Sequence, residues 1–170
     1  FRSDEVAARL SAAVERMQVG DGLQDGVTIG PLINDAATSK VLGHIDDARS
    51  RGAVATVGGG AHALGGRFVQ PTVLTGATPA MRLTNEETFG PVAPLFRFRG
   101  EAEALALANA TPFGLAAYFY TENIGRAWRI ADRLEFGMVG LNTGSVSMEM
   151  APFGGIKESG FGRERSEEHT

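Results

Sequence analysis

The sequence predicts an α/β fold of alternating helices and short strands, and three observations support that prediction. Hydrophobic residues make up 43% of the 170 residues and charged residues 21%, the balance of a globular protein rather than a disordered one. Stretches with helical apolar periodicity alternate with stretches of strand character along the chain. The spacing of these stretches implies crossover connections, which are typical of α/β folds.

Two helices are expected in the first half of the chain. Apolar residues recur with the helical period from Ser3 to about Val19. They form one stripe, made by Val6, Leu10, Ala13, Val14 and Met17. After a glycine-rich loop, Asn34 or Asp35 can cap a second helix, which ends where Gly52 suits a left-handed C-cap. The residues expected to face inward from this helix are Val41, Ile45 and Ala48.

The remaining elements are expected in alternating order. Residues 53–57 predict a short strand, and residues 68–74 an extended segment interrupted by Pro71. Further along, the predicted elements are a strand at 91–98, a helix at 101–109, a strand at 115–120, a helix at 123–134 and a strand at 137–141. Residues 142–162 are glycine-rich and aperiodic, and long irregular segments in compact domains are more often functional than decorative.

The charge balance and the absence of cysteine exclude several functions. With 16 basic and 20 acidic side chains the chain carries a formal net charge of −4, which argues against nucleic-acid binding. No apolar run is long enough to span a bilayer, so we expect a cytoplasmic protein with no membrane partner. Without cysteine, the chain itself can supply no disulfide, thiolate metal site or cysteine nucleophile.

Two weak motifs are interpreted structurally. His44, His62 and His169 lack metal-ligand spacing, so no metal site is expected. His44 is expected to be a partly exposed helix residue, and His62 a loop residue. Residues 58–63 nominally match a dinucleotide-binding fingerprint, but two further glycines interrupt any helix that could follow. A surface turn is therefore the favoured interpretation.

Two segments carry candidate chemistry. In residues 85–91, the adjacent carboxylates of Glu86 and Glu87 precede Phe89, and a carboxylate beside an aromatic ring can accept hydrogen bonds from sugar hydroxyls. A solvated turn before a strand is the alternative. In residues 151–160, glycine pairs allow the backbone to approach a ligand closely, and a purely structural loop is equally compatible.

These motifs, in this order, resemble one known family. Residues 86–92 and 152–164 resemble the C-terminal part of the NAD(P)-dependent aldehyde dehydrogenase superfamily. Further matches are residues 30–33, 68–74 and 112–115. Within the superfamily, residues 93–98 and 140–147 are most similar to succinate-semialdehyde dehydrogenases.

The resemblance implies the C-terminal part of the aldehyde dehydrogenase fold, mostly its catalytic domain. It assigns residues 1–155 to that domain and residues 156–164 to the start of a return segment toward the cofactor domain. Residues 165–170 do not match and resemble a translated sequencing adapter, so we expect them to be an artefact. The resemblance also implies that the chain is a fragment of a longer, homo-oligomeric protein.

The resemblance further implies oxidation of succinate semialdehyde to succinate, with NAD or NADP as cofactor. Glu87 matches the glutamate that binds the nicotinamide ribose, and Phe89 the aromatic residue that packs beside it. Ser147 matches a serine that binds the substrate's distal carboxylate, and Phe153 an aromatic residue of the substrate tunnel. The family's cysteine nucleophile and general-base glutamate match no position here, because they precede residue 1. We therefore expect no catalytic residue in this chain and no activity from it alone.

Two alternatives remain open at this point. The small-molecule substrate can be another semialdehyde or an uncharged aldehyde. The chain can also be a non-catalytic α/β module that serves binding or oligomerisation.

Overall fold

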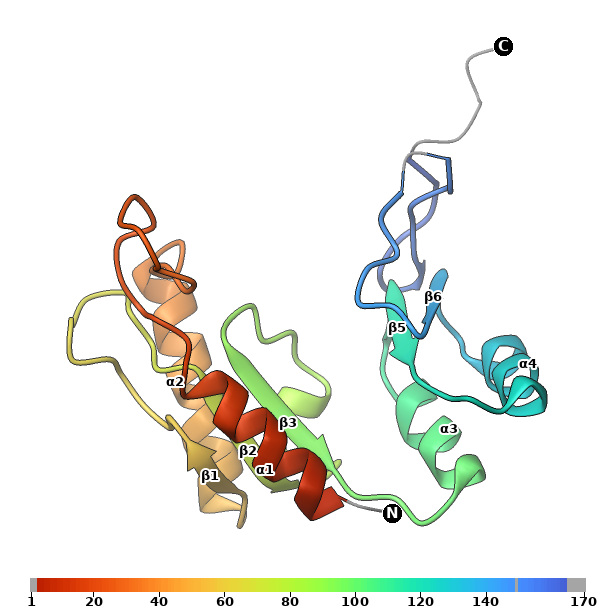
Figure 1. Ribbon diagram of the computed structural model, residues 1–170, viewed down its shortest axis with the longest axis horizontal. Coiled ribbons are helices and arrows are strands. Elements are labelled where there is room, and N and C mark those ends of the chain that lie inside the picture. Colours follow the sequence, from red (N-terminus) through yellow and green to blue (C-terminus); the bar gives the residue numbers. More distant parts are fainter. Residues whose placement is uncertain (1–2, 149, 165–170) are drawn as a thin grey trace. The chain divides into compact units, whose positions relative to one another are not determined.

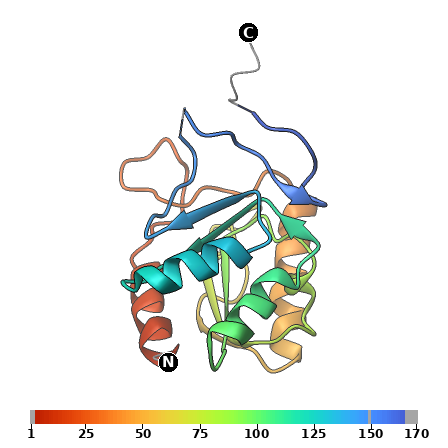
Figure 2. The same cartoon turned by 90° about the vertical axis from the view of Figure 1, so that its right-hand side faces the viewer.

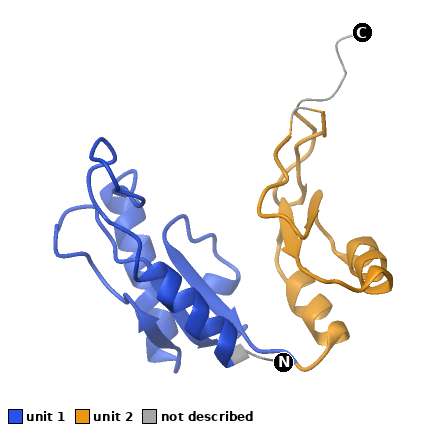
Figure 3. Ribbon diagram, viewed as in Figure 1, with its two compact units in different colours: residues 1–98 blue, residues 99–170 orange. Residues whose placement is uncertain are grey.

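The computed structural model describes residues 3–148 and 150–164. They fall into two compact units, unit 1 within residues 1–98 and unit 2 within residues 99–170 (Figure 3). The mixed α/β class predicted from the sequence is confirmed. The proposed family-domain boundary after residue 155 stays a prediction, and the hexapeptide 165–170 lies outside the described residues.

Unit 1 is a three-stranded sheet with a helix on each face (Figure 1). Its elements are α1 (Ser3–Val14), α2 (Asp35–Ser50), β1 (Val54–Val57), β2 (Thr72–Ala77), the 3-10 helix η1 (Arg82–Thr84) and β3 (Val92–Phe96). The central strand, β2, pairs antiparallel with β1 and parallel with β3. Its successive residues Val73 and Leu74 are both fully buried, as expected for a strand that is covered on both faces.

Helix α2 forms much of the core of unit 1, as its apolar pattern predicts. Val41, Ile45 and Ala48 are at most 1% exposed. The Asn34 side chain caps the helix by accepting a hydrogen bond of 2.8 Å from the Ala37 backbone. After the helix, the predicted left-handed glycine is confirmed at Gly52, with φ at 97°. Both helix ends thus lie where the sequence signals place them.

Helix α1 is shorter than predicted, because it ends at Val14 and not near Val19. Beyond Val14 the backbone pairs with a later loop and does not continue the helix. The Gln18 carbonyl accepts hydrogen bonds from the backbone N–H groups of Thr28 and Ile29. Two residues of the predicted apolar stripe, Val6 and Met17, are 48% and 42% exposed. The buried residues of the helix are Ser11 and Val14.

The glycine-rich segment after β1 is a loop, as interpreted from the sequence. Residues 58–71 contain no helix, and Ala61 forms an antiparallel bridge with Val69. The segment therefore closes as an irregular hairpin and supplies no helix N-terminus for a phosphate group.

Unit 2 contains a parallel strand pair joined by a helical crossover, which confirms the predicted connection. Its elements are α3 (Glu101–Asn109), β4 (Phe113–Gly114), β5 (Ala116–Phe119), α4 (Ile124–Arg133), β6 (Met138–Leu141) and β7 (Ile156–Lys157). Strand β5 pairs parallel with β6, and α4 connects them. Strand β4 pairs antiparallel with β7, an element that the sequence did not predict. Figures 1 and 2 show the segment after β6 extending away from α3 and α4.

Candidate functional site

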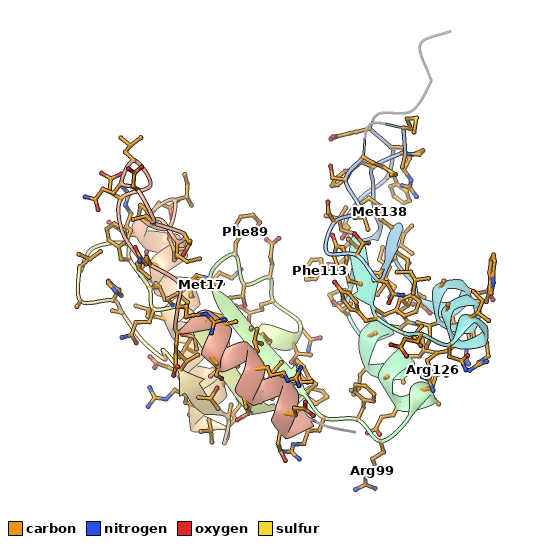
Figure 4. All side chains as sticks on the ribbon, in the orientation of Figure 1. Met17, Phe89, Arg99, Phe113, Arg126 and Met138 are labelled. Carbon is orange, nitrogen blue, oxygen red and sulfur yellow. The ribbon has the colours of Figure 1, made fainter. Side chains whose placement is uncertain are left out.

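The candidate site in unit 1 is the loop that connects η1 to β3. Exposure alternates along it: Glu86 and Thr88 are partly buried, whereas Glu87 and Phe89 are exposed. Phe89 is 79% exposed, and Figure 4 shows it projecting from the outer end of the loop. The two adjacent glutamates thus differ in exposure, because Glu86 is turned toward the protein and Glu87 toward solvent.

The inward residues of the loop bind one buried histidine of α2. The His44 side chain is completely buried. Its Nδ1 lies 2.7 Å from Thr88 Oγ1, and its Nε2 lies 3.0 Å from Glu86 Oε2. The expectation that His44 is partly exposed was wrong. The signal that could have found it is the helical period, since position 44 lies on the same face as the buried positions 41, 45 and 48.

The charge of Glu86 determines the hydrogen-bond roles of this histidine. Hydrogen bonds from Arg82 and then from His44 lower the pKa of the Glu86 carboxyl to about 2, so the group is ionised at neutral pH. An ionised carboxylate only accepts hydrogen bonds, so His44 Nε2 carries the proton and donates it. The second ring nitrogen, Nδ1, is paired with the Thr88 hydroxyl, which can serve as either donor or acceptor.

Arg82 extends this network back to α2. Asp47 Oδ2 of α2 accepts a hydrogen bond of 2.9 Å from the Arg82 backbone. That contact, followed by the side chain of Arg51, lowers the pKa of Asp47. Since the Arg82 side chain binds Glu86, α2 holds the loop both through His44 and through η1.

Close packing fixes the end of the loop. A Cβ atom placed on Gly90 would lie 2.6 Å from Cγ2 of Val41, much closer than atoms pack. Gly90 therefore lets the backbone approach α2 at a distance that no side chain allows. Hydrogen bonds at the start of the loop and this contact at its end leave Glu87 and Phe89 directed outward.

Glu87 and Phe89 are the two predicted site residues of unit 1, and the loop presents both to solvent. A carboxylate accepts hydrogen bonds from vicinal hydroxyls, and an exposed aromatic ring offers a flat apolar surface. This pair suits a ligand that combines a sugar with a planar ring.

The two predicted site residues of unit 2 lie in the segment between β6 and β7. Ser147 is exposed. Phe153 is partly buried, and its backbone exchanges hydrogen bonds of 2.9 and 2.7 Å with Glu164. Since Ser147 and Phe153 belong to unit 2 and the other pair to unit 1, each pair is positioned by its own unit.

Asn142 starts this segment and determines the geometry of its first turn. Its φ of 53° is positive, a conformation that asparagine tolerates better than most residues. Its side chain accepts a hydrogen bond of 2.8 Å from the Thr121 backbone N–H and donates one of 2.9 Å to the Thr121 carbonyl. Asn142 thereby turns the chain out of β6 and ties the turn to the end of β5.

Lys157 anchors the other end of the segment, and the sequence reasoning assigned it no role. Its Nζ donates hydrogen bonds of 2.9 Å to the Asn109 carbonyl and 3.3 Å to the Thr111 carbonyl. It also forms a 2.7 Å ion pair with Glu135. A cation suits this place, because the free carbonyls at the C-terminus of α3 carry partial negative charge.

The described residues contain no group of three histidine, cysteine, aspartate or glutamate side chains arranged to hold a metal ion. No helix in the described part of the chain is long and apolar enough to cross a membrane.

Comparison with known proteins points to one family. The family model described as "Aldehyde dehydrogenase family" matches residues 2–170. The chain is 54% identical over 163 residues to the succinate-semialdehyde dehydrogenase [NADP(+)] GabD of Escherichia coli K12. The matched region covers 96% of this chain and 34% of that protein. It is equally identical, over the same shares, to a 3-sulfolactaldehyde dehydrogenase of Pseudomonas putida. A glutarate-semialdehyde dehydrogenase of Pseudomonas aeruginosa is 53% identical over the same shares.

Solved structures agree with this assignment. A succinate-semialdehyde dehydrogenase from Burkholderia pseudomallei superimposes with a TM-score of 0.92 at 58% identity, over 94% of this chain and 33% of that one. A betaine aldehyde dehydrogenase from Staphylococcus aureus in complex with NAD+ superimposes with a TM-score of 0.91 at 36% identity, over 97% of this chain and 34% of that one. The chain spans about a third of the length of the relatives it matches.

Proposed function

Because the chain belongs to the aldehyde dehydrogenase family, we propose that it supplies the nicotinamide-ribose contacts and part of the substrate tunnel of an NAD(P)-dependent aldehyde dehydrogenase. The observation that carries this proposal is the outward presentation of Glu87 and Phe89 on a loop that α2 holds from behind.

The chemistry of that pair suits the cofactor. When bound, the nicotinamide of NAD or NADP accepts a hydride from the aldehyde-derived carbon. Glu87 accepts hydrogen bonds from the ribose hydroxyls, and the Phe89 ring packs beside the ribose and nicotinamide. Their contribution is orientation, because hydride transfer requires the donor and acceptor carbons to be held close together.

The proposed substrate is an aldehyde with an anionic group at its far end, with succinate semialdehyde as the first candidate. The names of three relatives support this class, since succinate semialdehyde, glutarate semialdehyde and 3-sulfolactaldehyde each carry a carboxylate or sulfonate. In this chain the Ser147 hydroxyl donates a hydrogen bond to that anionic group, and Phe153 lines the apolar path to it. A neighbouring arginine is needed for charge neutralisation.

The chain contains no cysteine, so the nucleophile of this reaction is assigned to a part of the protein outside the 170 residues. The general base is assigned there too. The chain alone is accordingly proposed to be inactive. A non-catalytic binding or oligomerisation module is the competing function, and the same absence of cysteine favours it.

A chimera tests the proposal. Residues 1–164 of this chain replace the matching third of the Escherichia coli enzyme, which retains the rest of its own sequence. We expect the chimera to reduce NADP+ with succinate semialdehyde, and with a kcat/KM at least about tenfold above that for propanal, the difference expected from one well-placed polar contact. A folded chimera that binds no NADP+ would refute the ribose assignment. A chimera that binds NADP+ but turns over no aldehyde would support the non-catalytic module.

A further inference from the structure

We propose that His44 is a positioning residue, whose imidazole sets the direction of Glu87 and Phe89 by holding Thr88 and Glu86. The inference rests on the proposed function, because it assigns His44 a role in cofactor binding that it exerts only through the loop.

The first argument is where the two hydrogen bonds fall. His44 binds the residue before Glu87 at 3.0 Å and the residue after it at 2.7 Å. Because one ring holds the side chains on both sides of Glu87, it restricts the backbone that carries Glu87 and Phe89. The observed exposure agrees with this, since Glu87 and Phe89 are exposed whereas Glu86 and Thr88 are partly buried.

The second argument is the complete burial of the ring. His44 has no exposed surface, so water cannot substitute for a partner that moves away. A buried polar group left without its hydrogen bond is unfavourable, so the ring strongly favours the one loop conformation that satisfies both nitrogens. An exposed histidine with the same two contacts would exert no such constraint.

The third argument distinguishes the two contacts. Glu86 is also held by Arg82, through Nε and Nη2, so this residue keeps a partner without the histidine. Among the hydrogen bonds found for the described residues, the Thr88 side chain has the contact to His44 alone. Thr88 therefore depends on His44 for its orientation, and it is adjacent to both outward residues.

The test substitutes Thr88 rather than His44, because removing a fully buried ring can disrupt the packing of α2. Thr88→Val has nearly the same shape and lacks the hydroxyl, and Thr88→Ser keeps it. The control is Thr56→Val, which removes a hydroxyl that binds Ser11 at 2.7 Å in the same unit, away from the loop. All variants are made in the chimera described above.

The main readout is the equilibrium Kd for NADP+, measured by calorimetry without turnover. We expect Thr88→Val to raise this Kd about 3- to 10-fold, the loss of one hydrogen bond, and Thr88→Ser to restore it. Hydrogen–deuterium exchange of residues 85–90 should rise in Thr88→Val alone. Thr56→Val should lower the melting temperature about as much as Thr88→Val does. It should leave both the Kd for NADP+ and the exchange of residues 85–90 unchanged.

A Glu87→Gln variant separates the two levels of the proposal. An unchanged Kd in Glu87→Gln would refute the ribose role of Glu87 and with it the inference. A raised Kd in Glu87→Gln together with an unchanged Kd in Thr88→Val would refute the role of His44 alone and leave the proposed function standing.

Discussion

Arg82 and Glu86 form a two-pronged contact, in which Nε and Nη2 of the arginine each donate a hydrogen bond of 2.9 Å to a different carboxylate oxygen. Parallel hydrogen bonds of this kind fix an orientation as well as a distance. The contact joins η1 to the start of the candidate cofactor loop, and it makes the stability of that region depend on pH.

The folded protein should lose stability in acid partly through Glu86. Its folded pKa of about 2 lies below the ordinary value of 4.5, so the ionised group stabilises the folded state above about pH 4.5. That contribution disappears as the pH falls from 4.5 toward 2. Urea unfolding of the chimera at pH 5, 4 and 3 should show a shallower decline for Glu86→Gln. The exposed Glu122→Gln is the control, and equal slopes for Glu86→Gln and the unmodified chimera would contradict the assignment.

Gly90→Ala should destabilise the protein by about 1–3 kcal/mol, because the new methyl group would overlap Val41. A Cβ there would be 2.6 Å from Val41 Cγ2, whereas one on Gly30, an exposed loop residue of the same unit, would meet nothing within 4 Å. Gly30→Ala is therefore the matched control and should change the free energy of unfolding little. Adding Val41→Ala to Gly90→Ala should recover part of the loss, which a double-mutant cycle measures. Strictly additive effects would mean that the two residues do not meet.

Lys157→Met should destabilise unit 2 by about 1–3 kcal/mol, because the carbonyls of Asn109 and Thr111 lose a charged donor while the aliphatic stem is retained. Denaturant unfolding measures the change. Lys40→Met removes an exposed lysine of α2 and should be nearly neutral. If the two substitutions changed the free energy of unfolding equally, the hydrogen bonds of Lys157 would contribute no more stability than an exposed lysine does.

Ser147→Ala in the chimera should raise the KM for succinate semialdehyde about 3- to 10-fold and leave the KM for propanal unchanged, since only the first substrate has an anionic group to bind. Steady-state kinetics on both substrates gives the comparison. Ser145→Ala, two residues earlier in the same segment, serves as the control. A rise of equal size for both substrates would refute the carboxylate role of Ser147.

Local signals predicted most of the fold. Helix α3 has the predicted bounds, and Asn34 and Asn123 cap α2 and α4 because their side chains accept hydrogen bonds from the first helical turn. The predictions of secondary structure were wrong where contacts with residues distant in the sequence determine the bounds or the existence of an element. The end of α1 depends on the pairing of Gln18 with a loop ten residues later, and the two-residue strand β7 exists only through its pairing with β4.

The roles assigned to the candidate site residues stay predictions, and the structure adds the contacts that support the loop. The resemblance selected Glu87 over Glu86, and in the structure Glu86 is engaged by Arg82 and His44 whereas Glu87 is exposed. No rule based on one sequence connects position 44 with positions 86 and 88, because the contacts join residues more than forty positions apart. Only the helical period hinted that His44 is buried.

The segment between β6 and β7 is anchored at both ends by contacts that do not involve its middle. Asn142 is tied to Thr121, and Lys157 to the end of α3. The proposed substrate contact of Ser147 and the two anchors of the segment therefore rest on different residues. We expect a substitution at Ser147 to change ligand preference while both anchors stay in place.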